Sequence, residues 1–169
     1  MRCLGALIGE NIDDLERCGV PVVRQVTRHG VTFRLAGPAF SIEVIVEPER
    51  WLGVRLNVLD VDGRRIQEYS IDTDAYSLWH PKHHAFAFAV EAEIVAMLQA
   101  LRVGTILIGN DRRGRPALVV PHGHEYVVCT KESFFGFGYE RARRFSSLQQ
   151  ILAVASLDRL APLAFPAGN

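Results

Sequence analysis

Five of the six histidines lie in two short clusters that could supply metal ligands. His80, His83 and His84 belong to the sequence Trp-His-Pro-Lys-His-His, and His122 and His124 belong to Pro-His-Gly-His-Glu. Neutral imidazole is the commonest metal ligand in proteins, and an i, i+2 pair within a strand projects from one face. A metal-dependent enzyme could therefore take ligands from both clusters. The ligands of this hypothesis are His80, His83, His122 and His124, with Glu125 or Asp74 as the base.

A run of aromatic residues and arginines, from Phe134 to Arg144, is the second candidate site. Aromatic side chains and arginine are enriched at the centres of protein–protein interfaces, so we interpret this stretch as part of a protein-binding surface. Trp51 supports the same interpretation, as do the acidic residues Asp72 and Asp74, which precede Trp79. The predicted partner-binding residues are Trp79, Asp72, Asp74, Phe135, Phe137, Tyr139, Arg141 and Arg144.

Two other interpretations of the aromatic and arginine stretch remain open. Aromatic rings stack on nucleic-acid bases and arginines contact phosphates, so Arg141, Arg143 and Arg144 could bind nucleic acid. Alternatively, the stretch is a connection loosened by glycine, whose rings pack under the last helix while the arginines form its first turn.

Standard catalytic signatures are not found in the sequence. There is no P-loop, no complete Gly-x-Gly-x-x-Gly motif and no Gly-x-Ser-x-Gly elbow. The sequence from His124 to Val128 departs from the zinc motif His-Glu-x-x-His at its last position. Cys129 fits a half-buried strand residue better than a nucleophile. These observations favour a protein without enzymatic activity or cofactor.

Charge and composition narrow the choice of partners. The 19 basic and 19 acidic side chains give zero net charge, so no long-range field attracts the chain to nucleic acid or to an anionic membrane. Three cysteines without a Cys-x-x-Cys pair fit a reducing compartment. The N-terminus is a poor signal peptide, and no run of about 18 apolar residues could span a bilayer. We therefore expect a soluble, cytoplasmic protein.

The elements that must position these residues begin with a helix and a series of short strands. Apolar residues at near-helical spacing predict an amphipathic helix over residues 4–18. Period-two alternation then predicts five strands, separated by turn signals such as His29-Gly30 and Asp60-Val61-Asp62-Gly63. Because short turns join antiparallel neighbours, we expect a five-strand meander. The predicted strands cover residues 22–26, 31–35, 41–47, 54–59 and 64–71.

The second half of the chain predicts a long central helix over residues 85–103, ended by Gly104. Three further strands are expected at residues 105–109, 117–120 and 125–130, with a hairpin loop at residues 110–115. A closing helix is predicted from Ser146 to Leu160, capped by Ser146 or Ser147. Residues 162–169 contain two prolines and are expected to form a flexible tail or to pack as a coil.

These elements predict one α+β domain over residues 1–169, with a mostly antiparallel sheet packed against two or three helices. The leading functional hypothesis is a small non-enzymatic module that binds another protein. Bacterial immunity proteins, each of which neutralises a cognate toxin, are one class of this kind. The first alternative is an enzyme that uses a divalent metal such as zinc, held by the histidine clusters. The second is a nucleic-acid-binding protein.

Overall fold

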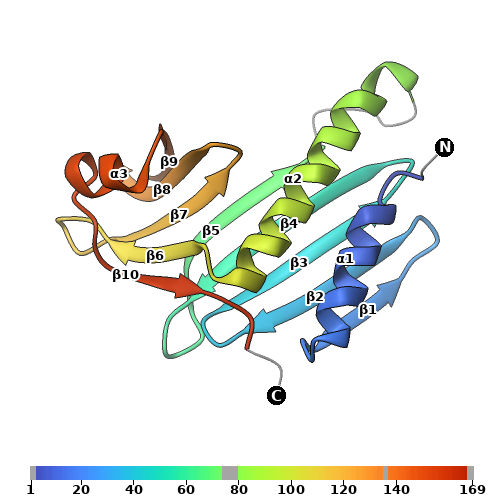
Figure 1. The fold of residues 1–169 in the computed structure, drawn as a ribbon, viewed down its shortest axis with the longest axis horizontal. Helices are drawn as coiled ribbons and strands as arrows, with labels where there is room; N and C mark the ends of the chain where they lie inside the picture. The colour runs from blue at the N-terminus through green and yellow to red at the C-terminus, as the bar shows by residue number, and fades with distance from the viewer. Residues whose placement is uncertain (1–2, 74–79, 135–136, 167–169) are drawn as a thin grey trace.

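The computed structural model describes residues 3–73, 80–134 and 137–166 of the 169-residue chain. Within them lie two five-stranded antiparallel sheets and three α-helices, which confirms the predicted α+β class (Figure 1). The first half of the chain consists of α1 (Ala6–Arg17), β1 (Val22–Val26), β2 (Val31–Gly37), β3 (Phe40–Glu47), β4 (Trp51–Leu59) and β5 (Arg65–Asp72). The second half consists of the 3₁₀ turn η1 (Pro81–His83), α2 (His84–Val103), β6 (Ile106–Asn110), β7 (Pro116–His122), β8 (Glu125–Phe134), β9 (Phe137–Phe145), α3 (Leu148–Val154) and β10 (Asp158–Leu163).

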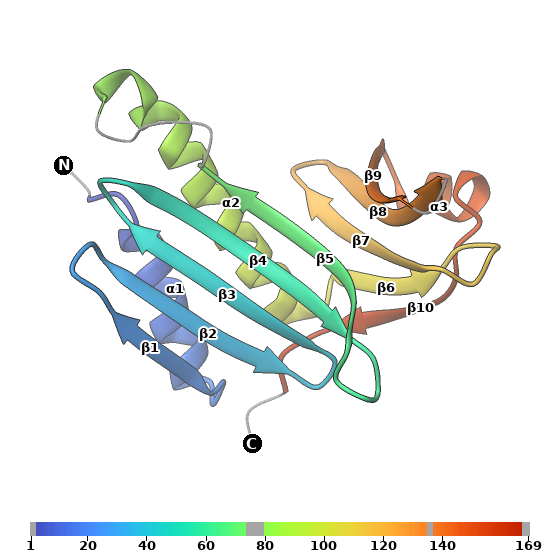
Figure 2. The same ribbon diagram turned by 180° about the vertical axis from the view of Figure 1, so that it is seen from behind.

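The first sheet is the predicted meander, with the strand order β1-β2-β3-β4-β5. Successive side chains of a strand point to opposite faces, so the alternating sequence gives the sheet one apolar face. On β3, for example, Phe40, Ile42, Val44 and Val46 are buried, and the residues between them are partly exposed. Helices α1 and α2 cover this apolar face, whereas no helix of the described residues lies over the opposite face (Figures 1 and 2).

Helix α2 contacts α1 and strands of both sheets. Because it has neighbours on several sides, it must be apolar around much of its circumference. Its buried residues are Ala87, Val90, Glu91, Ile94, Val95, Met97, Leu98, Ala100 and Leu101. The helix ends at Gly104, whose φ of 72° is the left-handed conformation that glycine adopts readily. Neither α2 nor any other helix among the described residues has the length and hydropathy needed to cross a bilayer.

A buried carboxylate connects α2 to the first turn of α1. Glu91 is fully buried, and its Oε1 accepts a hydrogen bond from the backbone N–H of Leu7 at 2.9 Å. The N-cap residue of α1 is Gly5, which has no side chain to satisfy the free N–H groups of that turn. The positive end of the helix dipole also favours a negative charge at this position. Glu91 therefore supplies, from a different helix, the cap that α1 lacks.

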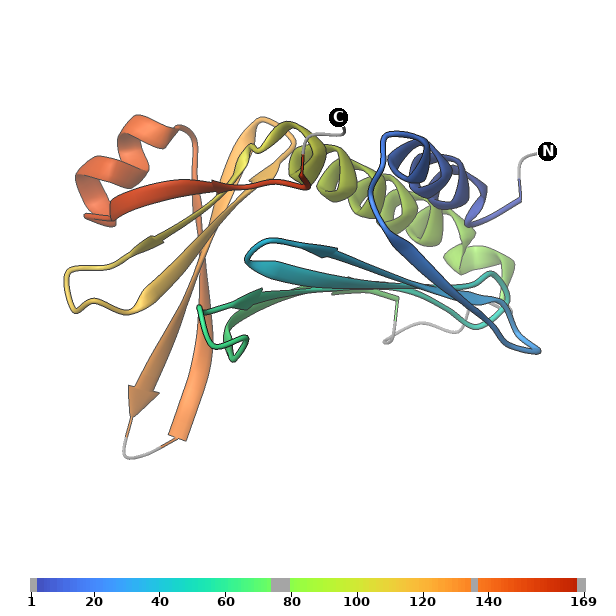
Figure 3. The same cartoon turned by 90° about the horizontal axis from the view of Figure 1, so that it is seen from below.

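The second sheet has the strand order β10-β6-β7-β8-β9 and a hydrophobic cluster on each face. Leu118, Val120 and Val127 join the main cluster, which includes residues of α2 and of both sheets. On the other face, Val128 and Phe145 join a smaller cluster with residues of the α3 segment. Helix α3 accordingly lies on the side of this sheet that is turned away from the first sheet (Figure 3).

The closing helix is shorter than the sequence predicted. The Ser147 hydroxyl caps it as expected, accepting a hydrogen bond from the backbone N–H of Gln150 at 3.2 Å. The helix ends at Val154 instead of Leu160, because the chain takes a left-handed conformation with φ 51° at Ser156 and again at Arg159. The following residues form β10, which pairs with β6, so the prediction of three further strands was too low.

Residues 162–166 pack against the fold and do not form a flexible tail: residues 162–163 lie in a strand, and residues 164–166 form a coil. Pro162 lies in β10, an edge strand, where its missing N–H leaves no gap in the sheet. Leu163 and Phe165 are only 3% and 7% exposed, and the Phe165 ring packs edge-on against Phe40 with 5.2 Å between the ring centroids. Residues 167–169 lie outside the described residues.

From residue 137 on, the aromatic and arginine stretch lies in a strand, so the alternative in which its arginines form the first turn of the last helix is wrong. Residues 137–145 form β9, which pairs with β8 from Tyr126↔Phe145 to Phe134↔Phe137. Successive residues such as Arg143 and Arg144 therefore point to opposite faces of the second sheet.

Replacing Glu91 tests whether it holds α1 in place. Glu91→Ala should lower the free energy of unfolding in urea by about 2–3 kcal/mol, because the Leu7 N–H loses its buried acceptor and a cavity remains. Glu91→Gln keeps a carbonyl oxygen at this position and should cost less. Glu93→Ala, at a partly exposed position of the same helix, is the control and should cost about 0.5 kcal/mol or less. Equal losses for Glu91→Ala and Glu93→Ala would contradict this role.

Gln67 on β5 is fully buried, and its side-chain oxygen and nitrogen have no hydrogen-bond partner among the described residues. A buried amide without partners is destabilising, whereas methionine has a similar shape and no such groups. Gln67→Met should therefore raise the free energy of unfolding by about 1 kcal/mol. The same change at Gln25, on the exposed strand β1, should have little effect. A destabilised Gln67→Met variant would show that the amide makes useful hydrogen bonds.

Candidate functional site

The predicted histidine ligands lie at separate places in the fold. His80 precedes η1 and His83 is its last residue, with 6.0 Å between their ring centroids. The Nδ1 of His80 accepts a hydrogen bond from the Lys82 backbone N–H. His122 is the last residue of β7 and His124 lies in the turn to β8, so they do not form the expected pair on one strand. Among the described residues, no group of three or more His, Cys, Asp or Glu side chains is placed to hold a metal ion.

Local surroundings shift the pKa of His83 and that of Tyr69, which lies in a cavity beside His122. Desolvation, followed by the charges of Lys82 and His80, lowers the pKa of His83 below its usual value. His122 borders a cavity of about 230 Å³ together with Tyr69 and Glu93. Burial there, aided by the charges of Cys129 and Glu93, raises the pKa of Tyr69 to about 12. Tyr69 is therefore a neutral hydroxyl at physiological pH.

The predicted partner-binding residues are described only in part. Trp79, Asp74 and Phe135 lie outside the described residues, as do the side chains of Phe137, Tyr139 and Arg141 on β9. Asp72 is exposed on β5 of the first sheet. Arg144 is exposed on β9 of the second sheet, where its guanidinium lies 3.6 Å from the Glu125 carboxylate. The described part of the chain thus places Asp72 and Arg144 in different sheets.

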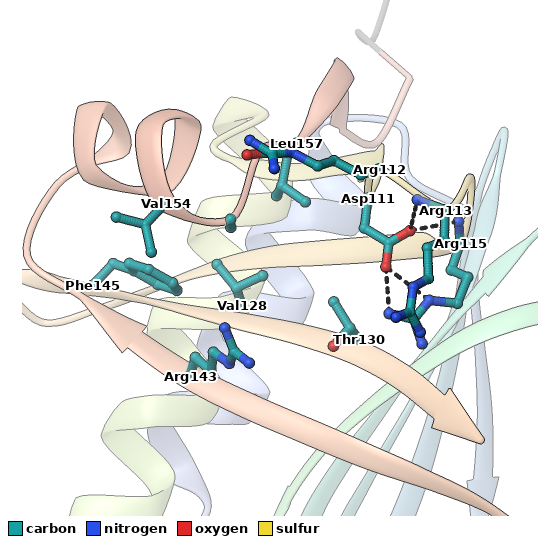
Figure 4. A pocket seen from close by; sticks show the side chains of 12 residues that line it. Asp111, Arg112, Arg113, Arg115, Val128, Thr130, Arg143, Phe145, Val154 and Leu157 are labelled. Carbon is teal, nitrogen blue, oxygen red and sulfur yellow. Dashed lines mark hydrogen bonds and ion pairs between the residues drawn. The ribbon is translucent and has the colours of Figure 1, made fainter. Parts of the chain in front are cut away.

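A pocket of about 400 Å³ beside α3 gathers residues that the sequence had not grouped (Figure 4). It lies between the loop that joins β6 to β7, the strands β8 and β9, and the segment that ends α3. The lining residues are Asp111, Arg112, Arg113, Arg115, Val128, Thr130, Arg143, Phe145, Val154, Ala155, Ser156 and Leu157. Four arginines and one aspartate give this lining a formal charge of +3 in a chain of zero net charge.

Asp111 organises the loop on one side of the pocket. Its Oδ1 accepts hydrogen bonds from the backbone N–H groups of Arg113 and Arg115 at 2.8 and 2.9 Å. Its Oδ2 accepts from the Arg115 guanidinium, at 2.7 Å from Nε and 2.6 Å from the terminal nitrogen. Gly114, with φ 72°, allows the chain to turn back. The single carboxylate of the pocket is therefore fully used in holding the loop (Figure 4).

The hydrogen bonds of Asp111 determine its protonation. Partial burial opposes ionisation, but the hydrogen bonds from the Arg115 side chain and from the backbone of Arg115 and Arg113 together lower the pKa of Asp111. Asp111 remains a carboxylate, and its charge is directed at Arg115.

Three other arginines of the pocket have no such partner. Arg112, Arg113 and Arg143 are exposed, and no carboxylate of the described residues pairs with their side chains. Arg112 and Arg113 come from the loop, whereas Arg143 comes from β9 on another side of the pocket (Figure 4). Arginine presents several N–H donors in a planar group that suits carboxylate and phosphate oxygens. The pocket can therefore bind an anion between two elements.

The rest of the pocket is apolar because α3 covers only part of the outer face of the second sheet. Val128, Phe145 and Leu157 are buried beneath or beside the helix, and Val154 is exposed at the pocket edge. Ser156 also lines the pocket, and its positive φ is the backbone conformation that ends the helix there. A ligand in this pocket would contact guanidinium groups on one side and hydrocarbon on the other.

Sequence reasoning missed most of this site. Arg112, Arg113 and Arg115 were interpreted only as parts of a hairpin turn, and the helix was expected to continue past Ser156. The available signal was the spacing Asp-Arg-Arg-Gly-Arg, in which aspartate and glycine build the loop and the arginines have no role in turning the chain. Arg143 was named only as part of the aromatic and arginine stretch, without any connection to the loop arginines.

No family model, curated protein or solved structure matches this chain.

The turn between β4 and β5 provides a matched control for Asp111. Asp60 accepts hydrogen bonds from the backbone N–H groups of Asp62 and Arg64 in the same pattern, and Gly63 has φ 75°. Only the Asp111 loop adds an ion pair to a guanidinium. Asp111→Asn should therefore cost about 1 kcal/mol more of unfolding free energy than Asp60→Asn, as measured in urea at neutral pH. Equal costs would show that the Arg115 ion pair does not stabilise the fold.

The stability cost of Asp111→Asn should also depend on pH. Because the pKa of Asp111 is lower in the folded state, its stabilisation is complete above the unfolded pKa of about 3.9. It is lost as the pH falls through the lower folded pKa. The difference between wild type and Asp111→Asn should thus be constant from about pH 7 to about pH 5 and shrink below about pH 4. A difference that grew on acidification would have the wrong sign.

Proposed function

We propose that this protein is a non-enzymatic protein-binding module that uses α3 and the adjacent arginine-lined pocket to hold another protein. The observation that carries the proposal is the exposure of Leu152 and Val154, at 50% and 61%, beside a pocket with four arginines. Only Ile151 of this helix is buried. The buried core of a protein interface is more apolar than the rest of the surface, and arginine is enriched at interfaces.

The pocket chemistry indicates what such a partner presents. Apolar side chains would cover Leu152 and Val154, and acidic groups would enter the pocket. Arginine binds carboxylates through two parallel hydrogen bonds, which adds orientation as well as affinity. Opposite charges across the interface would also speed association.

Within this class, we favour a bacterial immunity protein that acts in the cytoplasm and neutralises a cognate toxin. A toxin whose active site contains carboxylates would present acidic groups of the kind that the pocket can bind. Pairing them with Arg112, Arg113 and Arg143 would cover that active site without any reaction by this protein.

The proposal is tested by capture of the protein encoded next to this one, with the purified chain as bait. The double variant Leu152→Ser/Val154→Ser should bind the captured partner about tenfold or more weakly, because each change removes apolar contact from the interface. The control is Val26→Ser/Val61→Ser, which alters two valines that are 81% and 103% exposed elsewhere on the surface. Titration calorimetry of the purified pair gives both affinities.

Two results would contradict the proposal. One is a bait that captures no protein in a fixed molar ratio from its own cell lysate or from the neighbouring gene product. The other is an equal affinity of the α3 variant and the wild type for the captured partner.

A further inference from the structure

The arginine-lined pocket has many hydrogen-bond donors and no available carboxylate acceptor. The side chains of Arg112, Arg113 and Arg143 donate only, and the hydroxyls of Thr130 and Ser156 can also donate. The carboxylate of Asp111 already accepts from the loop backbone and from Arg115. A ligand must therefore bring several acceptor oxygens of its own.

The charge of the lining distinguishes between two kinds of anion. The lining has a formal charge of +3, and one carboxylate would neutralise only a single positive charge of it. A phosphate monoester carries a charge of about −1.5 to −2 at neutral pH and three strong acceptor oxygens. Arginine forms paired, charge-assisted hydrogen bonds with phosphate oxygens.

The apolar floor indicates what carries the phosphate. Val128, Phe145 and Leu157 are buried below the pocket, and Val154 stands at its edge. In Figure 4 the Arg112 and Arg143 side chains reach in from the loop and from β9, next to these hydrocarbon groups. A volume of about 400 Å³ accommodates a ring together with a phosphate.

We propose that this pocket binds a phosphate monoester attached to an apolar or aromatic group. The inference rests on the proposed function in that the same pocket is part of the partner-binding surface, but a small ligand is enough to test it. The phosphate would belong either to a phosphorylated side chain of a protein partner or to a free organic phosphate. In both cases the guanidinium groups bind the phosphate and the floor contacts the attached group.

Calorimetric titration of the intact chain with phenyl phosphate tests the inference, with benzoate as the singly charged control of similar shape. Phenyl phosphate should bind in a 1:1 ratio and about tenfold more tightly than benzoate at about pH 7.5. At about pH 5.5 its affinity should fall about fourfold, because most of the phosphate then carries one charge. The charged groups of the lining are the four arginines and Asp111, whose pKa is lowered by its hydrogen bonds.

Arginine variants locate the binding site. Arg143→Gln and Arg112→Gln each remove one unpaired guanidinium from opposite sides of the pocket and should weaken phenyl phosphate binding about tenfold. Both positions are exposed, so the variants should keep the wild-type circular dichroism spectrum. Arg50→Gln, in the exposed turn before β4, changes the net charge equally and should leave the affinity unaltered.

Two further ligands separate the sources of the phosphate. A site for a free organic phosphate should bind adenosine monophosphate more tightly than a short phosphotyrosine peptide, and a site for a phosphorylated partner should do the reverse. Either order of the two affinities supports the phosphate site, provided that Arg143→Gln and Arg112→Gln both weaken binding of the tighter ligand.

The inference is overturned if phenyl phosphate does not bind up to about 10 mM, if benzoate binds equally well, or if Arg50→Gln weakens binding as much as Arg143→Gln. Loss of phosphate binding with partner capture intact would reject this inference alone. Phosphate binding without any captured partner would reject the proposed protein-binding function alone.

Discussion

The part-buried hydrogen bond between Glu91 and the Leu7 N–H is the interaction on which the arrangement of the first layer depends. Helix α2 must contact α1 and both sheets, and a helix buried on several sides leaves little space for polar groups. The one carboxylate that it does bury lies at the positive end of α1. This position satisfies a helix N-terminus that has no cap of its own and fixes how α1 lies across the first sheet.

The pocket exists because α3 stops early. Had the helix continued to Leu160, its next turns would have followed the outer face of the second sheet. The left-handed residue Ser156 instead directs the chain to the sheet edge, where β10 pairs with β6. Part of the outer face near Arg143 therefore stays uncovered, and the arginines of the neighbouring loop border it. Helix length, strand pairing and binding site are consequences of the same local conformation.

The first sheet and α2 were predictable because their signals are local: alternation along the strands, turn residues between them and glycine after the helix. The end of α3 was not, because Leu157 and Leu160 continue a helical spacing while also fitting the apolar cluster from a non-helical segment. The pocket was hidden for another reason, since its lining comes from four separate stretches of the chain. For the histidines, residue type was informative about chemistry, but only three-dimensional placement shows that the described side chains do not form a metal site.

The loops at Asp60–Arg64 and Asp111–Arg115 share one backbone design, with aspartate first, glycine fourth and arginine fifth. In this design the second and third positions make no side-chain contribution to the turn. They are Val61 and Asp62 in one loop and Arg112 and Arg113 in the other. Selection can therefore exchange these two side chains without refolding the hairpin. Ligand preference in this protein is thus separable from its architecture, so related chains could diverge in what they recognise while keeping the same scaffold.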